Sequence, residues 1–267
     1  MKASSPLTIH CAVALMLGAI TLMAHGAARE GVLSAFSKDA LERITPSAYK
    51  VEAAMRLPSG PGKAKQYLFG LSDEIADFND LMNIPARAPM LILAESDHGL
   101  VVHDRVHIEP ADGGGPSDMP AGLQPNYFIA MSEQEVGAAT LYLVTSRWFG
   151  GGSGSADFFD FYRVQGGHLQ LLKRFMHGRM EQPYFAIYRK AIYDGVLRCE
   201  RGAKHGKAYV YTCRIDVTKY AYDGEAVRAL ATEPLRVRSG NRYLGDSYRF
   251  VSVLKALANK EVFADQR

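Results

Sequence analysis

Residues 140–175 read TLYLVTSRWF, GGGSGS, ADFFDFYRV, QGGH and LQLLKRF in order, and this stretch decides the fold. Three runs rich in aromatic and β-branched residues, separated by glycine-rich joints, predict three consecutive antiparallel strands. In the first run Leu141 and Leu143 share one face of the strand, and Tyr142 and Val144 share the other. Because both faces are apolar, we expect this meander to lie in a sheet covered on both sides.

The two joints predict different turns. Gly166 and Gly167 can both adopt positive φ, as a tight primed hairpin turn requires. The longer joint at 150–155 predicts a wide hairpin loop. Beside it, Trp148 and Phe149 are candidate contact residues, because large aromatic side chains dominate contact energies at protein interfaces.

Further elements are expected on both sides of the meander. Helical spacing of apolar residues predicts a short helix that Pro46 ends, and a second helix that Ser72 caps, with Ile75, Phe78 and Leu81 facing inward. PMLILAES (89–96) and LVVHDRVHIEP (100–110) predict a hairpin.

The C-terminal part of the chain is also predicted to consist mainly of strands joined by turns. Strands are expected after Pro183, with turns at Asp194-Gly195 and Asp223-Gly224, and a closing helix buries Phe250, Val251, Leu254 and Leu257. The predicted class is therefore a β-rich α+β fold, an antiparallel sheet or sandwich of meander hairpins with short flanking helices at both ends.

The N-terminus has the composition of a secretory signal peptide. Lys2 precedes the apolar run CAVALMLGAITLMA, and small residues follow at 26–28. The run is shorter than the roughly 20 residues of a membrane-spanning helix, so cleavage is favoured over an anchor. We expect a signal peptide over 1–26 and a periplasmic or extracellular mature protein without a transmembrane segment.

The mature chain, 27–267, is expected to form one β-rich domain with an uneven distribution of charge. The whole sequence carries a net charge of +3, but residues 27–181 hold 14 Lys and Arg against 19 Asp and Glu, and 189–249 hold 13 against 7. The acidic part (27–181) and basic part (182–267) can dock on each other, or the basic part can face an anionic surface. Nucleic acid is not expected as a partner.

Two cysteines remain after removal of the first 26 residues, Cys199 and Cys213. In an oxidising compartment an even number of cysteines predicts a disulfide. If a hairpin folds about Gly206, both residues lie seven positions from its centre and fall opposite each other. We therefore expect a structural bond that braces this hairpin.

The braced hairpin is the leading candidate for a binding site. It carries basic and tyrosine side chains together, a composition typical of protein contact surfaces. With the two aromatic residues by the 150–155 loop, the candidate binding residues are Arg198, Arg201, Lys204, Lys207, Tyr209, Tyr211, Trp148 and Phe149. The predicted function is that of a non-enzymatic binding protein of the inhibitor or immunity type, with a protein partner and no cofactor.

The densest group of titratable residues suggests the alternative, a hydrolase acting on a cell-wall or lipid substrate. It comprises Asp97, His98, His103, Asp104 and His107, where a base or a metal such as zinc could act. However, HDRVH lacks the glutamate of the HExxH zinc motif, and its surroundings favour a strand. On a strand His103 and His107 lie roughly 13 Å apart, too far to bind one metal. The 111–126 loop, rich in glycine and proline, carries no assigned role.

Overall fold

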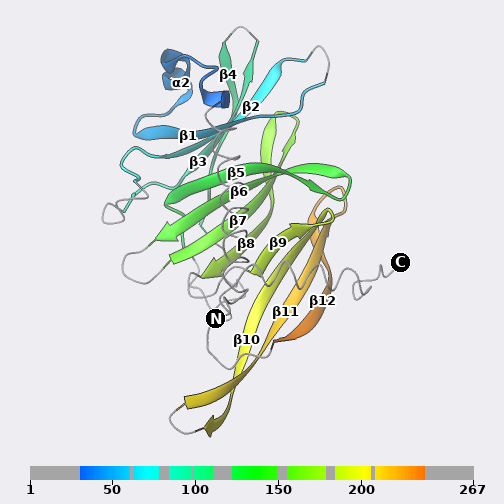
Figure 1. Ribbon diagram of the computed structural model, residues 1–267. Coiled ribbons are helices and arrows are strands. Elements are labelled where there is room, and N and C mark those ends of the chain that lie inside the picture. Colours follow the sequence, from blue (N-terminus) through cyan, green and yellow to red (C-terminus); the bar gives the residue numbers. More distant parts are fainter. Residues whose placement is uncertain are drawn as a thin grey trace, which may run out of the picture.

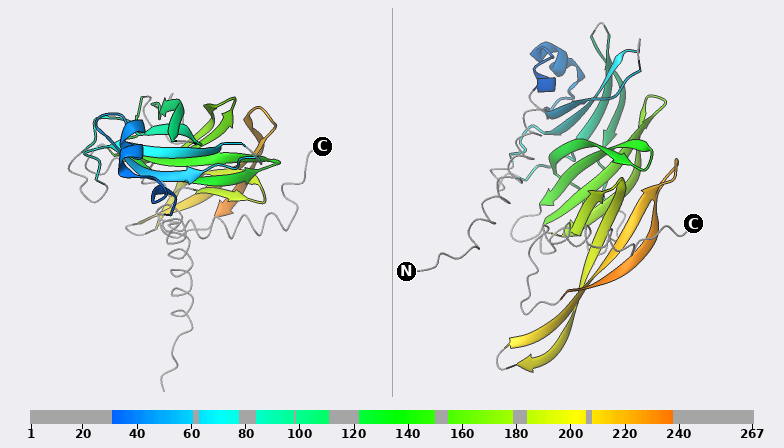
Figure 2. Two further views of the ribbon diagram at one scale, coloured as in Figure 1. Left: turned by 90° about the horizontal axis from the view of Figure 1, so that it is seen from above. Right: turned by 45° about the vertical axis from the view of Figure 1, so that its right-hand side comes forward.

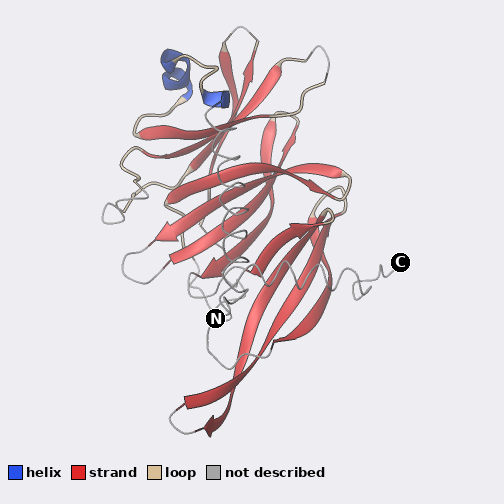
Figure 3. Ribbon diagram, in the orientation of Figure 1, coloured by secondary structure: helices blue, strands red, loops and turns tan. Residues whose placement is uncertain are grey.

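The computed structural model describes residues 31–60, 63–77, 84–97, 99–110, 122–149, 155–178, 184–205 and 208–237. Within these ranges the chain forms antiparallel β-structure with little helix (Figures 1 and 3). The strands make three four-stranded sheets, ordered β1-β2-β3-β4, β5-β6-β7-β8 and β12-β11-β10-β9. The β-rich class with meander hairpins is therefore confirmed.

Every sheet is built from strands that follow one another in the chain, each paired with its sequence neighbour. In the first sheet the strands are β1 (Tyr49–Arg56), β2 (Lys65–Asp73), β3 (Met90–Ser96) and β4 (Leu100–His107). In the middle sheet they are β5 (Tyr127–Val136), β6 (Ala139–Phe149), β7 (Ser155–Gln165) and β8 (His168–Gly178). In the third sheet they are β9 (Tyr184–Tyr188), β10 (Ala191–His205), β11 (Ala208–Tyr222) and β12 (Val227–Val237).

The middle sheet contains the meander predicted from 140–175, and both of its faces are buried. Tyr142 and Val144 of β6 pack against the first sheet in a core cluster with Leu68 and Leu93. Leu141 of β6 packs in the opposite cluster, with residues of the third sheet. The predicted alternation is correct, because successive side chains of a strand point to opposite faces. Gly166 and Gly167 make the turn between β7 and β8 with φ of 60° and 82°.

The first and middle sheets approach closely where β2 crosses β5. A Cβ built on Gly70 would lie 2.3 Å from the ring of Phe128, so only glycine fits there. Phe128 is buried in the cluster that joins the two sheets. This contact fixes the spacing of the two layers.

A short helix covers the outer face of the first sheet. It is α2 (Lys38–Ile44), and the Ser37 hydroxyl accepts a hydrogen bond from the Ala40 amide at its start. Ile44 and the partly buried Leu41 pack on Phe69 and other residues of this sheet. The N-terminal helix expected before Pro46 is thus present, while the signal peptide and the C-terminal helix lie outside the described residues.

Two local predictions are wrong. Ser72 does not cap a helix: it lies in β2, and Ile75 is largely exposed in a turn, while Phe78 and Leu81 lie outside the described residues. Asp194-Gly195 is not a turn but lies inside β10. The turn before β10 is formed by Arg189 and Lys190, which adopt left-handed conformations, whereas the turn at Asp223-Gly224 is present.

No helix in the described ranges is both long and apolar enough to cross a lipid bilayer.

Candidate functional site

The β10–β11 hairpin extends far beyond the rest of its sheet (Figures 1 and 2). β10 pairs with β11 from Ile192 to His205. Its other neighbour, β9, pairs only with Ala191–Gly195, and β12 pairs with β11 only between Cys213 and Tyr222. Among the described strands, residues 200–205 and 208–212 therefore form a two-stranded extension, and we call the segment 200–212 the ribbon.

An isolated two-stranded ribbon is marginally stable in water, because neither face has a sheet or helix to pack on. The base of this hairpin is different. Ile192 is buried between the middle and third sheets, and Val217 is buried on the other face of the third sheet. Tyr193 packs in the same cluster as Val217, and this burial raises the pKa of its hydroxyl group. The packed base therefore holds the ribbon away from the body of the protein.

The ribbon and its junction with the sheet are rich in basic residues. Residues 198–214 contain five Lys and Arg and one acidic residue, Glu200. At the junction, Arg198 and Arg214 both contact Asp216, with Nε–Oδ distances of 2.8 and 3.0 Å. One carboxylate thus compensates two guanidinium groups there.

The remaining candidate residues of the hairpin are placed by its backbone. Arg201 is the register partner of Tyr211, and Lys204 is the partner of Tyr209. A β-bulge between Arg201 and Lys204 interrupts the regular pairing. Lys207 and the side chains of these four residues lie outside the described part of the structure. The ribbon therefore carries four of the candidate residues, Arg201, Lys204, Tyr209 and Tyr211, and Arg198 lies at its junction with the sheet.

The hairpin turns where the sequence predicted, since His205 pairs with Ala208. This register makes Cys199 and Cys213 direct partners on adjacent strands. Their side chains lie outside the described residues, and no disulfide is among the interactions that the structure describes. The bond between them stays a prediction.

Trp148 and Phe149 belong to the middle sheet and are not part of this hairpin. Phe149 is buried in a cluster with Tyr127, and Trp148 is half-buried beside Phe158 and Met176. Their side chains stabilise the end of the middle sheet. The joint expected to expose them, 150–154, lies outside the described residues.

The histidines of the alternative site lie on a strand, as predicted. His103 contacts Glu95 at 3.1 Å, and His107 packs beside Tyr49 with ring centroids 6.2 Å apart. In the described ranges, no three His, Cys, Asp or Glu side chains are placed to hold a metal. His98 lies outside these ranges. The hydrolase alternative gains no supporting observation from this geometry.

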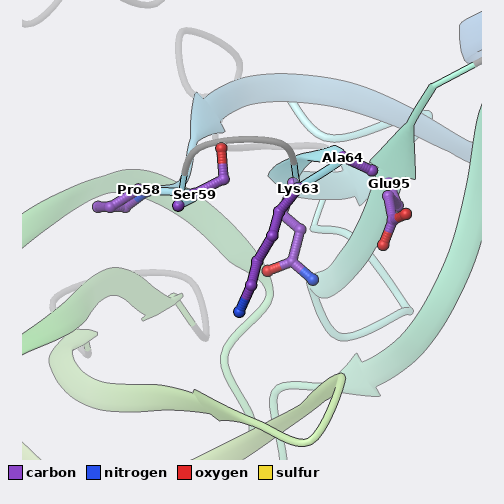
Figure 4. A pocket seen from close by; sticks show the side chains of 7 residues that line it. Pro58, Ser59, Lys63, Ala64 and Glu95 are labelled. Atoms are coloured by element: carbon purple, nitrogen blue, oxygen red, sulfur yellow. The ribbon is translucent and has the colours of Figure 1, made fainter.

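A small polar pocket of about 380 Å³ lies at the loop between β1 and β2 (Figure 4). Pro58, Ser59, Lys63, Gln66 and Glu95 are among its lining residues. Its walls thus mix one cation and one carboxylate with small polar groups. Glu95 is also the partner of His103. This lining selects no particular class of ligand.

Sequence reasoning missed a buried pair between the middle and third sheets. His177 Nε2 of β8 lies 2.8 Å from Asp194 Oδ1 of β10, and both side chains are less than a tenth exposed. Phe159 and Phe185 flank the imidazole. A histidine and a carboxylate at this distance also occur in catalytic triads, but here both are enclosed in the interface. The pair positions the base of the hairpin on the middle sheet.

Comparisons with known proteins do not assign this chain to a family. No family model matches the sequence, and neither the curated proteins nor the solved structures give a significant match.

Proposed function

We propose that this protein is an exported, non-enzymatic binding protein that uses the β10–β11 ribbon to contact another protein. The observation that carries the proposal is the extension of the ribbon beyond both neighbouring strands. A two-stranded ribbon has little intrinsic stability in water, so the ribbon adds little to the stability of the fold. We infer that it serves binding instead.

The basic composition supports a protein partner with an acidic surface. Arg201, Lys204 and Lys207 lie on the ribbon sequence, and Tyr209 and Tyr211 are interspersed with them. Tyrosine and arginine are enriched at protein interfaces, and complementary charge accelerates association. An inhibitor or an immunity protein that neutralises an incoming toxin fits this arrangement.

Export is part of the same proposal. The N-terminal sequence has the charged, apolar and small-residue regions of a signal peptide. Mass spectrometry of the mature protein from the producing cell should find an N-terminus close to residue 27, in the periplasmic or extracellular fraction. An intact N-terminus in the cytoplasm would contradict export.

Capture experiments with charge-reversed variants test the binding surface. Arg201, Lys204 and Lys207 are replaced together by Glu, and the tagged protein is used to retain partners from the producing cell. The control replaces Lys38, Arg56 and Lys65, three exposed residues on or beside the first sheet, by Glu. Both variants change the net charge equally.

The hairpin variant should lose a partner that the wild-type and control proteins retain. Retention by both variants would show that the ribbon is not the contact site. Loss in both variants would show that net charge, and not the ribbon, determines the interaction.

A further inference from the structure

Next to the ribbon, one edge of β10 has no neighbour among the described strands. β9 pairs with β10 at Ala191–Gly195, and none of the other described strands lies on that side farther along β10. We call residues 196–201, up to the β-bulge, the free edge of β10.

The direction of the backbone groups along the free edge follows from the turn. Arg189 and Lys190 form a two-residue turn with φ of 47° and 59°, which makes Tyr188 and Ala191 a hydrogen-bonded pair. In an antiparallel ladder the hydrogen-bonded pairs alternate, so every second residue after Ala191 points its N–H and C=O toward the β9 side. These outward residues are Leu197, Cys199 and Arg201.

The residues between them have the opposite orientation. Val196, Arg198 and Glu200 point their backbone groups toward β11, where their register partners are Asp216, Arg214 and Thr212. Along the free edge, one set of amides is therefore hydrogen-bonded to β11. The other set points to the β9 side, where none of the described strands accepts its hydrogen bonds. Such an edge is a template for another extended segment.

Charge limits what this segment can be. The stretch 198–214 carries a large excess of Lys and Arg over acidic residues. Antiparallel pairing of the same edge from two copies about Cys199 would run the ribbon of one copy into β9 of the other, because β9 already pairs with Ala191–Gly195. This overlap disfavours a self-complementary dimer. A segment with regularly spaced Asp or Glu has the opposite charge and fits.

We propose that the partner binds by strand addition, with an extended acidic segment pairing along the free edge of β10. This mode rests on the proposed function, because it specifies how the same hairpin holds its protein partner. Main-chain hydrogen bonds to Leu197, Cys199 and Arg201 supply affinity. The basic side chains nearby select an acidic segment over a basic one.

Amide hydrogen exchange followed by NMR on the full chain tests this pattern. The probe is the synthetic peptide ETETETETE, and one control is KTKTKTKTK. A second control, ETEPPEETE, keeps the acidic charge but has adjacent prolines, so that both edges of the peptide strand lack a central amide hydrogen. The acidic probe should slow exchange at Leu197, Cys199 and Arg201. Val196, Arg198 and Glu200 should change little, because their amides already donate within the hairpin.

Leu197→Pro supplies a matched variant, because it removes an outward amide and leaves the donors toward β11 in place. It should weaken binding of ETETETETE by about tenfold, the effect of one lost hydrogen bond. Protection of Val196, Arg198 and Glu200 in the unbound variant reports whether the hairpin still forms. If it does not form, the comparison of ETETETETE with ETEPPEETE decides the question independently.

Equal binding of ETETETETE and ETEPPEETE would overturn strand addition, and so would protection without the alternating pattern. In that case loss of the natural partner from the charge-reversed hairpin variant would still support the proposed function. Absence of binding by both acidic peptides would overturn the inferred acidic segment. Retention of the natural partner by the charge-reversed variant would refute the binding site itself.

Discussion

Arg174→Met should destabilise the protein strongly at neutral pH, because it leaves the buried carboxylate of Asp160 without its ion-pair partner. The Arg174 guanidinium holds both oxygens of Asp160 at 2.7 and 2.8 Å and donates to the carbonyl of Glu109, just after β4. Asp160 is fully buried, and the Arg174 side chain is 13% exposed. Removing one partner of such a pair costs about 3–5 kcal/mol. For a chain of this size the melting temperature should fall by roughly 6–20 °C.

The loss should shrink as the pH falls. Burial raises the pKa of Asp160, although the hydrogen bonds and charge of Arg174 oppose that rise. Without Arg174 the folded-state pKa rises further above the unfolded value of about 3.9. A group with a raised folded-state pKa contributes stability that is fully present below the unfolded pKa and is lost as pH rises through the folded pKa. The variant should therefore approach wild-type stability near pH 4.

Urea unfolding at a series of pH values between about 7 and 4 measures this difference in unfolding free energy. The matched control is Arg147→Met, which breaks a more exposed pair with Asp157 in the same sheet. The control should lose only about 1 kcal/mol, with a weaker pH dependence. A pH-independent deficit of Arg174→Met, or no deficit at neutral pH, would refute the argument from the buried carboxylate.

Two further substitutions test the fold, and a disulfide measurement tests the hairpin. Gly70→Ala should cost about 1–3 kcal/mol, because the new methyl group overlaps the Phe128 ring, and chemical denaturation should show a lower midpoint. His177→Leu should lower the melting temperature by leaving the carboxylate across the interface unpaired; an unchanged value would mean that the pair does not hold the sheets. The oxidised mature protein should contain a disulfide between Cys199 and Cys213, found by mass spectrometry of peptides, and its reduction should cost about 3 kcal/mol. Two free thiols in the exported protein would exclude this bond.

The meander was predictable because its information is local. Alternating apolar residues on both faces of β6, and two glycines at the turn to β8, specify strands and register within 36 residues of chain. The histidines His103 and His107 were correctly placed on a strand for a similar reason. Their valine neighbours favour extended backbone.

The errors came from residues whose environment is set by distant parts of the chain. Ser72 has the local features of a helix cap, but β2 pairs with β1 and β3 through this position and near it. Asp194-Gly195 has the composition of a turn, yet Asp194 meets His177 of another sheet. Tertiary contacts overrode turn and helix preferences at both places.

The candidate site was predictable only in part. The symmetric spacing of Cys199 and Cys213 about Gly206 indicated the hairpin and its register. Its projection beyond β9 and β12 was not visible in the sequence, because it depends on where neighbouring strands end. Phe149 was expected beside an exposed loop, but it is buried in a core cluster.

The most direct test of the ribbon as a binding site is to shorten it. Asn-Gly replaces residues 201–211, so that a two-residue turn joins Glu200 to its register partner Thr212. Captured partner is then quantified against the wild-type protein, with both proteins first shown to melt within a few degrees of each other. We expect a folded protein that retains much less partner, because Arg201, Lys204 and Lys207 are removed while the amides of Leu197 and Cys199 remain. Undiminished capture by the shortened protein would contradict this expectation.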